Sequence, residues 1–294
     1  MEIKELIAGA LSTLPDNTQD SVDVDSLLEM WSDAEITEPN LINICEKETE
    51  PIKKSLWLKC LIAYKVFDAQ EGKSSININE IYTLIYNSLN LLDEEQILSR
   101  IGSQGFLSIP VFRLDKKEES FDLLRLHIWD KELEQHINRE KADNFSIHSH
   151  QFHAHSWILS GNVHNTLYEV QPAESQTDYS HFEIKWKNNL KKVNERQSIA
   201  SNTKKYVSVD KTSRSEYSAG QAYTIPAGKF HKSGTNKDQP INSTLFLFSS
   251  KFSRVPKSFV LGPSYIHESE INRSKDIDAK PLLKKLKNHI SDES

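Results

Sequence analysis

Four histidines stand close together in the stretch His148-Ser-His150-Gln-Phe-His153-Ala-His155. In an extended strand, His148 and His150 would project from the same face, about 6.6 Å apart, so that two imidazoles could share one ion. Neutral imidazole is a ligand for Zn, Cu, Fe and Ni. Burying several imidazoles without a partner would cost desolvation free energy. The cluster therefore predicts a metal site rather than a purely structural group of side chains.

A further histidine, His231, ends a stretch with particular backbone demands, Gly220-Gln-Ala-Tyr-Thr-Ile-Pro226-Ala-Gly228-Lys-Phe-His231. Proline fixes one backbone angle, and glycine permits a positive one. Pro226 and Gly228 therefore predict a tight turn after a strand, and this turn would deliver His231 to a defined position. The chain has only 9 glycines, yet Gly161, Gly220 and Gly228 all lie in these two histidine-bearing segments.

The spacing of this second segment resembles the second sequence motif of the cupin superfamily. That motif reads glycine, five residues, Pro-x-Gly, two residues, histidine, three residues, asparagine. Its first positions are matched by Gly220, Pro226, Gly228 and His231, and Asn236 comes one residue late.

The histidine cluster resembles the first cupin motif, which reads glycine, five residues, His-x-His, three or four residues, glutamate, six residues, glycine. His148 and His150 fit this motif, and Gly161 lies one residue before the expected last glycine. Two positions depart from it: Ala142 replaces the opening glycine, and His155 stands where the glutamate ligand is expected.

The resemblance covers about residues 105–262 and implies a small β-barrel of double-sheet type, with a metal held by histidines inside its mouth. The implied ligands are four histidines, or three without His155: His148, His150, His155 and His231. Because His155 has the opposite strand parity to His150, it needs a turn or bulge to point inward, and it is otherwise a pocket residue. His153 has the same parity problem and no counterpart in the family.

Cupins with three histidine ligands include the thiol dioxygenases, such as cysteine dioxygenase, whose iron leaves positions open for substrate and oxygen. In that enzyme a cysteine stands at the position of His155 and is cross-linked to a tyrosine. This chain has no cysteine after Cys60, so the cross-link cannot form within the barrel region. The resemblance to that enzyme is therefore one of scaffold and metal triad.

Three other side chains are candidates for catalytic roles. Tyr223 lies in the strand before the predicted turn, and Tyr168 lies in the strand predicted after Gly161. A tyrosine in the pocket would donate a proton or a hydrogen bond to substrate, with Glu169 as an alternative general base. Arg125 interrupts an apolar run, where it would either hold a substrate carboxylate in bidentate fashion or lie on the barrel exterior. The competing interpretation of the tyrosines is an ordinary strand position.

Apolar residues at helical spacing predict helices in the first hundred residues. Pro51 suits the first position of a helix that ends near Gly72. Asn79 suits the cap of a second helix, and Asp93-Glu94-Glu95 suit the start of a third. Further helices are predicted over residues 1–14, 23–31 and 281–290.

Beyond Gly102-Ser-Gln-Gly105, short runs rich in branched and aromatic residues predict an antiparallel sandwich or barrel. The predicted strands are residues 106–114, 121–129, 156–160, 164–170, 181–187, 206–209, 221–225 and 245–249. The span 185–214 carries nine basic residues. It is interpreted as a long solvated loop, and as a candidate lid, in preference to a contact with RNA or single-stranded DNA.

The predicted fold class is therefore α+β. It combines a helical accessory domain over residues 1–104, an antiparallel double-sheet cupin (jelly-roll) barrel over 105–264 and a C-terminal helical tail over 265–294. Residues 1–50 hold 13 acidic side chains against 2 lysines, which leaves about +5 of net charge on the rest of the chain. This acidic region is interpreted as a solvated helical face, with a docking surface for a basic protein partner as the alternative.

Length, composition and charge limit the classes of protein to which this chain can belong. A chain of 294 residues that is 37% hydrophobic suits one or two globular domains, and its net charge of −6 argues against a generic nucleic-acid binder. No apolar run approaches the roughly 20 residues that span a membrane, and the first residues do not look like a signal peptide. Cys45 and Cys60 cannot build a disulfide framework. We expect a cytoplasmic protein with a small-molecule substrate, and the family leaves homodimer formation open.

Three functions follow as hypotheses. The first is an Fe(II) dioxygenase that acts on a small polar molecule such as a thiol or amino acid derivative, with iron on His148, His150 and His231. The second is a redox-neutral isomerase, lyase or hydrolase that uses Zn, Ni or Mn at the same site to polarise a carbonyl or acidify water. The third is a non-catalytic sensor, in which the barrel binds a small ligand and the helical domain reports it to a partner.

Overall fold

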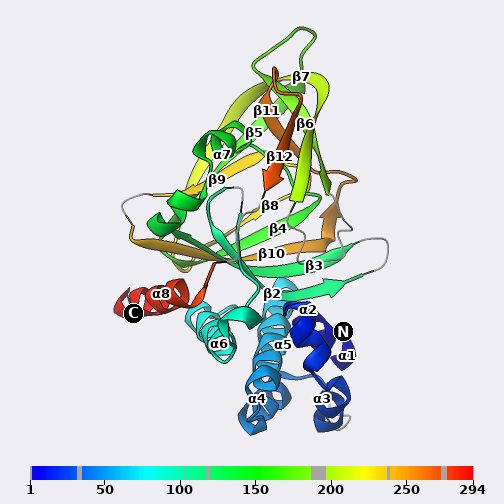
Figure 1. Ribbon diagram of the computed structural model, residues 1–294, viewed down its shortest axis with the longest axis vertical. Helices are drawn as coiled ribbons and strands as arrows, with labels where there is room; N and C mark the ends of the chain where they lie inside the picture. The colour runs from blue at the N-terminus through cyan, green and yellow to red at the C-terminus, as the bar shows by residue number, and fades with distance from the viewer. Residues whose placement is uncertain are drawn as a thin grey trace. The chain divides into compact units, whose positions relative to one another are not determined.

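The computed structural model describes residues 2–31, 35–102, 104–116, 120–186, 197–236, 239–272 and 277–293 (Figure 1). The chain divides into two compact units. The first unit comprises Met1–Ser99, Ile109–Leu126 and Asp278–Ser294, and the second comprises Arg100–Ser108 and His127–Ile277.

The first unit is largely helical. Its helices are α1 (Ile3–Leu11), α2 (Asp16–Ser21), α3 (Val24–Trp31), α4 (Glu38–Lys47), α5 (Pro51–Gln70), α6 (Ile78–Asn90) and α8 (Lys280–Glu293), with a single 3₁₀ turn, η1 (Glu94–Gln96). Helix α5 is the central element, because α1, α4 and α6 all pack on it, and α8 packs on α6 (Figure 1).

Local sequence signals explain how these helices begin. Pro51 opens α5 as predicted, and the Glu50 carboxylate caps it by accepting from the backbone N–H of Ile52 at 3.0 Å. The predicted cap of α6 is wrong by two residues, because it is the Asn77 side chain that accepts from the helix. The helix predicted from Asp93 is also wrong, since its acidic residues form only the short turn η1.

Helix α5 buries the charged side chain of Lys59 inside this unit. Lys59, on α5, is only 1% exposed, and its amino group donates to the Thr13 hydroxyl at 2.8 Å. The Thr13 hydroxyl in turn donates to the carbonyl oxygen of Ala10. Burial lowers the pKa of Lys59 to about 7, because the charged form is poorly solvated there.

The second unit carries most of the strands. The strands are β1 (Arg100–Ile101), β2 (Leu107–Asp115), β3 (Phe121–Asp130), β4 (Phe152–Ser160), β5 (Asn162–Pro172), β6 (Tyr179–Trp186), β7 (Gln197–Ser218), β8 (Ala222–Ile225), β9 (His231–Thr235), β10 (Ile241–Arg254), β11 (Phe259–Pro263) and β12 (Glu268–Asn272). A 3₁₀ segment, η2 (Lys131–His136), and the short helix α7 (Arg139–Asn144) precede β4.

The strands form two antiparallel sheets. One has the order β1-β2-β3-β10-β4-β8, and the other has the order β11-β6-β7-β5-β9, with β12 paired to β7. The sheets share a buried cluster in which Val163 of β5 meets Ala154, Ile158, Tyr223, Ile225 and Phe246 of the first sheet. The predicted α+β class is thus observed. Within the described residues, neither sheet closes on itself, because the first and last strands of each order are not paired with each other, so a closed jelly-roll barrel stays a prediction.

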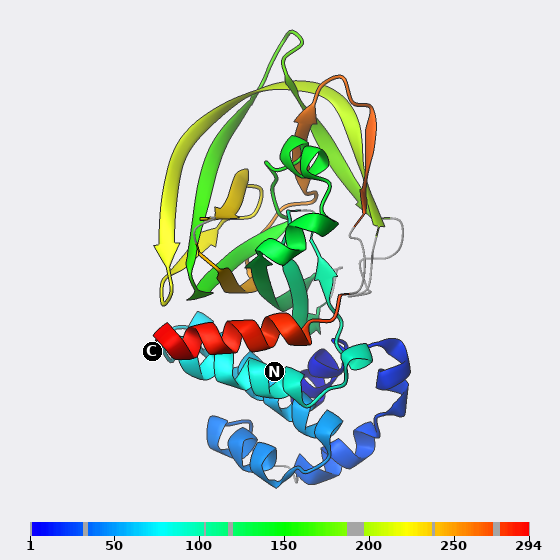
Figure 2. The same ribbon diagram turned by 60° about the vertical axis from the view of Figure 1, so that its left-hand side comes forward.

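The long loop predicted over residues 185–214 is largely wrong. Strand β6 continues to Trp186, and β7 occupies Gln197–Ser218, where it pairs with β5 as a long curved ladder (Figure 2). Only residues 187–196 of the predicted loop lie between these strands, and they are outside the described part of the chain. Strand β7 lies inside its sheet, between β6 and β5, and also pairs with β12.

Across the described residues, no helix combines the length and apolar character that crossing a membrane requires.

Replacing Lys59 by methionine tests the cost of the buried amine. Between pH 7 and 10.5 the unfolded chain binds more protons at this position than the folded chain, so stability rises with pH across that window. We expect Lys59→Met to raise the free energy of unfolding at pH 7 by about 1–4 kcal/mol, with a gain that shrinks towards pH 10. Urea unfolding measures this, with Lys54→Met on the same helix as control. A destabilised Lys59→Met protein at pH 7 would contradict the expectation.

Candidate metal centre

Two of the predicted ligands come from an extended segment that precedes β4, and the third comes from the first residue of β9. The backbone N–H of His148 donates to the carbonyl oxygen of His231 at 3.0 Å, and the N–H of His231 donates back at 2.9 Å. On its other side, His148 forms a bridge with Val260 of β11. His148 is therefore an isolated bridge position that backbone pairing fixes from both sides.

The predicted turn positions His231. Gly228 adopts a positive φ of 78°, and the N–H of Lys229 donates to the carbonyl oxygen of Pro226 at 3.2 Å. The N–H of Gly228 also donates to the carbonyl oxygen of His150 at 2.9 Å. The turn is thus tied directly to the segment that carries the other two histidines.

The three imidazoles converge. The ring centroids lie 4.7 Å apart for His148 and His150, 4.3 Å for His148 and His231, and 4.7 Å for His150 and His231. One ring nitrogen from each histidine lies within 4.8 Å of the other two. Such a spacing brings the three nitrogens to within a small adjustment of the separations at which they would share one ion, to which imidazole binds at about 2.1 Å.

Burial keeps these rings neutral. It lowers the pKa of His148 to about 4 and holds the pKa values of His150 and His231 well below the ordinary range. The neighbouring histidines lower the pKa values of His150 and His231 further, because two imidazolium ions so close together would repel. Neutral imidazole is the form that binds metals.

Hydrogen bonds to the imidazole rings determine which ring nitrogen of each histidine could bind a metal. Nδ1 of His148 lies 3.1 Å from the carbonyl oxygen of Ser146, and Nδ1 of His231 lies 3.2 Å from that of Lys229. In each case Nδ1–H donates to a carbonyl oxygen two residues earlier. This leaves the Nε2 lone pair of His231 for an ion, whereas Nε2 of His148 also lies 3.2 Å from the amide nitrogen of Gln104. Metal-binding histidines usually have such an orienting partner. The donor set therefore fits a divalent metal.

Four neighbours that the sequence did not single out surround the histidines. The rings of Phe248 and Phe246 lie 4.7 and 6.0 Å from His150. His127 stacks on Phe246 at 5.0 Å and further lowers the pKa of His150. The amide nitrogen of Gln104 lies 2.8 Å from Nδ1 and 3.2 Å from Nε2 of His148. The available signals were the Gly-x-x-Gly turn around Gln104 and the alternation of the two phenylalanines along a strand.

His155 is not brought to this group. It lies within β4, opposite Leu247 of β10 and Thr224 of β8. Its ring stacks on Trp157 at 3.9 Å, and burial lowers its pKa to about 4. His153 lies on the same side of β4, against Phe252. A register shift against β10 lies between Phe152 and His153, whereas the pairing from His153 through Trp157 is regular, so strand parity keeps both rings away from the side that carries Ala154.

The three candidate catalytic residues lie in different places. Tyr223 belongs to the same buried cluster as Phe246 and stacks on Tyr217 at 4.7 Å. Tyr168 packs with Phe230 against another apolar cluster, that of Ile147, Val207 and Leu261. Burial raises the pKa of both Tyr168 and Tyr223, so their phenols are protonated at neutral pH. Arg125, on β3, belongs to the first unit.

No protein-family model matches the chain, and no curated protein matches it. Similar solved structures include a tryptophan-to-tyrosine variant of oxalate decarboxylase from Bacillus subtilis, at 11% identity over 60% of this chain and 30% of that chain, with a TM-score of 0.25. Hydroxypropylphosphonic acid epoxidase from S. wedmorenis aligns at 9% identity over 72% of this chain and 96% of that chain, with a TM-score of 0.27. CapF aligns at 10% identity over 66% and 44%, with a TM-score of 0.25. The chain thus spans less than a third of the oxalate decarboxylase chain, and these TM-scores are too low to establish a shared fold.

Alanine substitutions test the ligand set. We expect the purified protein, reconstituted anaerobically with Co(II), to bind one ion per chain, and His231→Ala to lose it because one of three donors is gone. His155→Ala is the matched control, and it should keep the ion because its ring stacks on Trp157 instead. Equilibrium dialysis with mass-spectrometric metal analysis measures both, and circular dichroism checks folding. If His155→Ala lost the ion while His231→Ala kept it, His155 and not His231 would be the ligand.

Proposed function

We propose that this protein is a metal-dependent oxidoreductase, an Fe(II) dioxygenase acting on a small polar molecule such as a thiol or amino acid derivative. The observation that carries the proposal is the convergence of His148, His150 and His231 as three neutral nitrogen donors. Zn, Ni and Mn remain the alternative ions, since imidazole binds several metals.

The composition of the donor group supports this chemistry. Three neutral imidazoles leave the positive charge of a divalent ion uncompensated and leave coordination positions free. The three histidines would hold an Fe(II) ion, which would supply Lewis-acid and one-electron redox chemistry, while the substrate itself would supply the electrons that reduce oxygen. The role of the protein is to keep the three nitrogens in place, which the paired backbone of His148 and His231 does.

The surroundings support a small substrate with both polar and apolar parts. Phe246 and Phe248 give His150 an apolar neighbourhood that excludes water and strengthens electrostatic interactions inside the site. The ring of His127 is the polar group that would orient such a substrate. Gln104 acts on His148 directly, so we treat it as a positioning residue.

Oxygen consumption tests the reaction class. We expect the Fe(II)-loaded protein to take up oxygen when a panel of thiols and amino acids includes a substrate, and His150→Ala to abolish the uptake, because the iron is lost. An oxygen electrode measures the rate, with His153→Ala as the matched histidine control. Stoichiometric Zn, Ni or Mn with no oxygen uptake would favour the redox-neutral enzyme. Ligand binding that persists in a metal-free His150→Ala protein would favour the sensor.

Replacing Gln104 tests the positioning role. We expect Gln104→Ala to keep its metal but to lose about 10–100-fold in metal affinity or turnover, the usual cost of removing a group that orients a ligand. The d–d absorption of the Co(II) form should also shift, because the His148 ring is less constrained. Gln171→Ala, an exposed glutamine that contacts Glu169, is the control. An unchanged spectrum together with unchanged turnover would show that Gln104 plays no part.

A further inference from the structure

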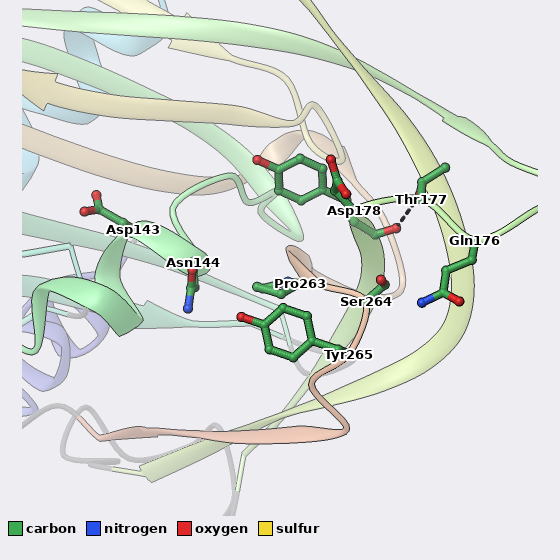
Figure 3. A pocket seen from close by; sticks show the side chains of 9 residues that line it. Asp143, Asn144, Gln176, Thr177, Asp178, Pro263, Ser264 and Tyr265 are labelled. Atoms are coloured by element: carbon green, nitrogen blue, oxygen red, sulfur yellow. Dashed lines mark hydrogen bonds between the residues drawn. The ribbon is translucent and has the colours of Figure 1, made fainter.

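The second unit contains a separate cavity that includes none of the three histidines (Figure 3). Its volume is about 740 Å³, and its lining comes from the end of α7, from residues 176–179 and from residues 263–265. That volume lies within the range of small-molecule sites, about 300–1,000 Å³. The cavity is therefore large enough for a compact organic ligand.

The lining is acidic. It contains the carboxylates of Asp143 and Asp178, and none of its nine residues is a lysine, arginine or histidine. The nearest cation recorded for these acids is Lys232, whose Nζ lies 4.0 Å from Oδ1 of Asp143. Both partners are exposed, and such pairs contribute little. A positively charged ligand would meet attraction here without a competing basic side chain in the wall.

Two tyrosine rings complete the lining. The side chains of Tyr179 and Tyr265 are 37% and 73% exposed, and they are two of the five large hydrophobic residues exposed in the described part of the chain. Figure 3 shows the Tyr265 ring beside Pro263 at the cavity. The face of a phenol ring attracts cations, and exposed aromatic rings gathered in a hollow favour a bound partner.

The walls are held by the backbone. Pro263 pairs with Tyr179 in the β6–β11 ladder, and the N–H of Ser264 donates to the carbonyl oxygen of Asp178 at 2.9 Å. The Thr177 hydroxyl lies 2.9 Å from the carbonyl oxygen of Tyr179 (Figure 3). Asp178, Tyr179 and Pro263 are thus fixed relative to one another, so a ligand would find most of the site already formed.

We propose that this cavity binds a small organic cation, a primary or alkylated ammonium compound with an apolar body. The ammonium group would lie near Asp178 and the faces of Tyr179 and Tyr265, and the apolar body would cover Pro263. This inference does not depend on the metal centre, because the two sites share no lining residue.

Calorimetric titration of the full chain tests it with a matched pair of probes. We expect 2-phenylethylammonium to bind and its neutral counterpart 2-phenylethanol to bind at least about fivefold more weakly, because only the former carries charge. Tyr265→Ala and Asp178→Asn should each weaken binding of the amine by about threefold to tenfold. Raising the salt concentration should weaken it as well.

Three control variants separate the site from general effects. Phe252→Ala removes another exposed aromatic ring, and Asp210→Asn removes another exposed carboxylate, so both should bind the amine as the wild type does. His231→Ala should also bind it, which separates this proposal from the metal site. Absence of amine binding, equal binding of amine and alcohol, or wild-type affinity in Tyr265→Ala and Asp178→Asn proteins that remain folded by circular dichroism would overturn the proposal.

Discussion

The candidate metal centre depends on one backbone interaction, the pair of hydrogen bonds between His148 and His231. These residues are 83 positions apart in number, yet each donates its N–H to the other's carbonyl oxygen. Residues directly opposite each other in antiparallel pairing project to the same side. The pairing therefore brings two imidazoles together, and His150, two residues along the same segment, joins them. Without this contact, the histidines would be a local cluster and a distant single residue.

Bringing these three histidine rings together would be unfavourable without a bound ion. Burial lowers the pKa values of all three rings, which shows how poorly the site solvates a charged imidazole. The Nδ1 atoms of His148 and His231 lie beside the carbonyl oxygens of Ser146 and Lys229, and one nitrogen of each of the three rings lies within 4.8 Å of the others. An ion would bind the nitrogen lone pairs that converge there. Phe246 and Phe248 keep the surroundings apolar and so strengthen any charge interaction inside.

The cavity beside Asp178 has the opposite electrostatic character. The candidate metal centre would offer neutral nitrogen donors to an inorganic cation, while the cavity would offer carboxylates and phenol faces to the organic cation that we propose. The walls of the two sites are built on the same sheet, since β11 supplies Val260 beside His148 and Pro263 beside Tyr179. One strand thus contributes different residues to the surroundings of both candidate sites.

The sequence by itself determined the features that are local. The spacing His148-x-His150 predicted two candidate ligands on one segment, Pro226-x-Gly228 predicted the turn before His231, and Pro51 predicted the start of α5, because each depends on backbone angles or spacing within a few residues. Only the tertiary structure decided which other side chains reach the site. The regular pleat of β4 turns His155 towards Trp157, and the pairing of distant segments brings in Gln104, His127 and the two phenylalanines.

The burial of Lys59 was likewise not predictable from the sequence, since it depends on packing around α5 and not on local pattern. Contacts between segments far apart in sequence depend on strand register and packing, which a local pattern does not encode.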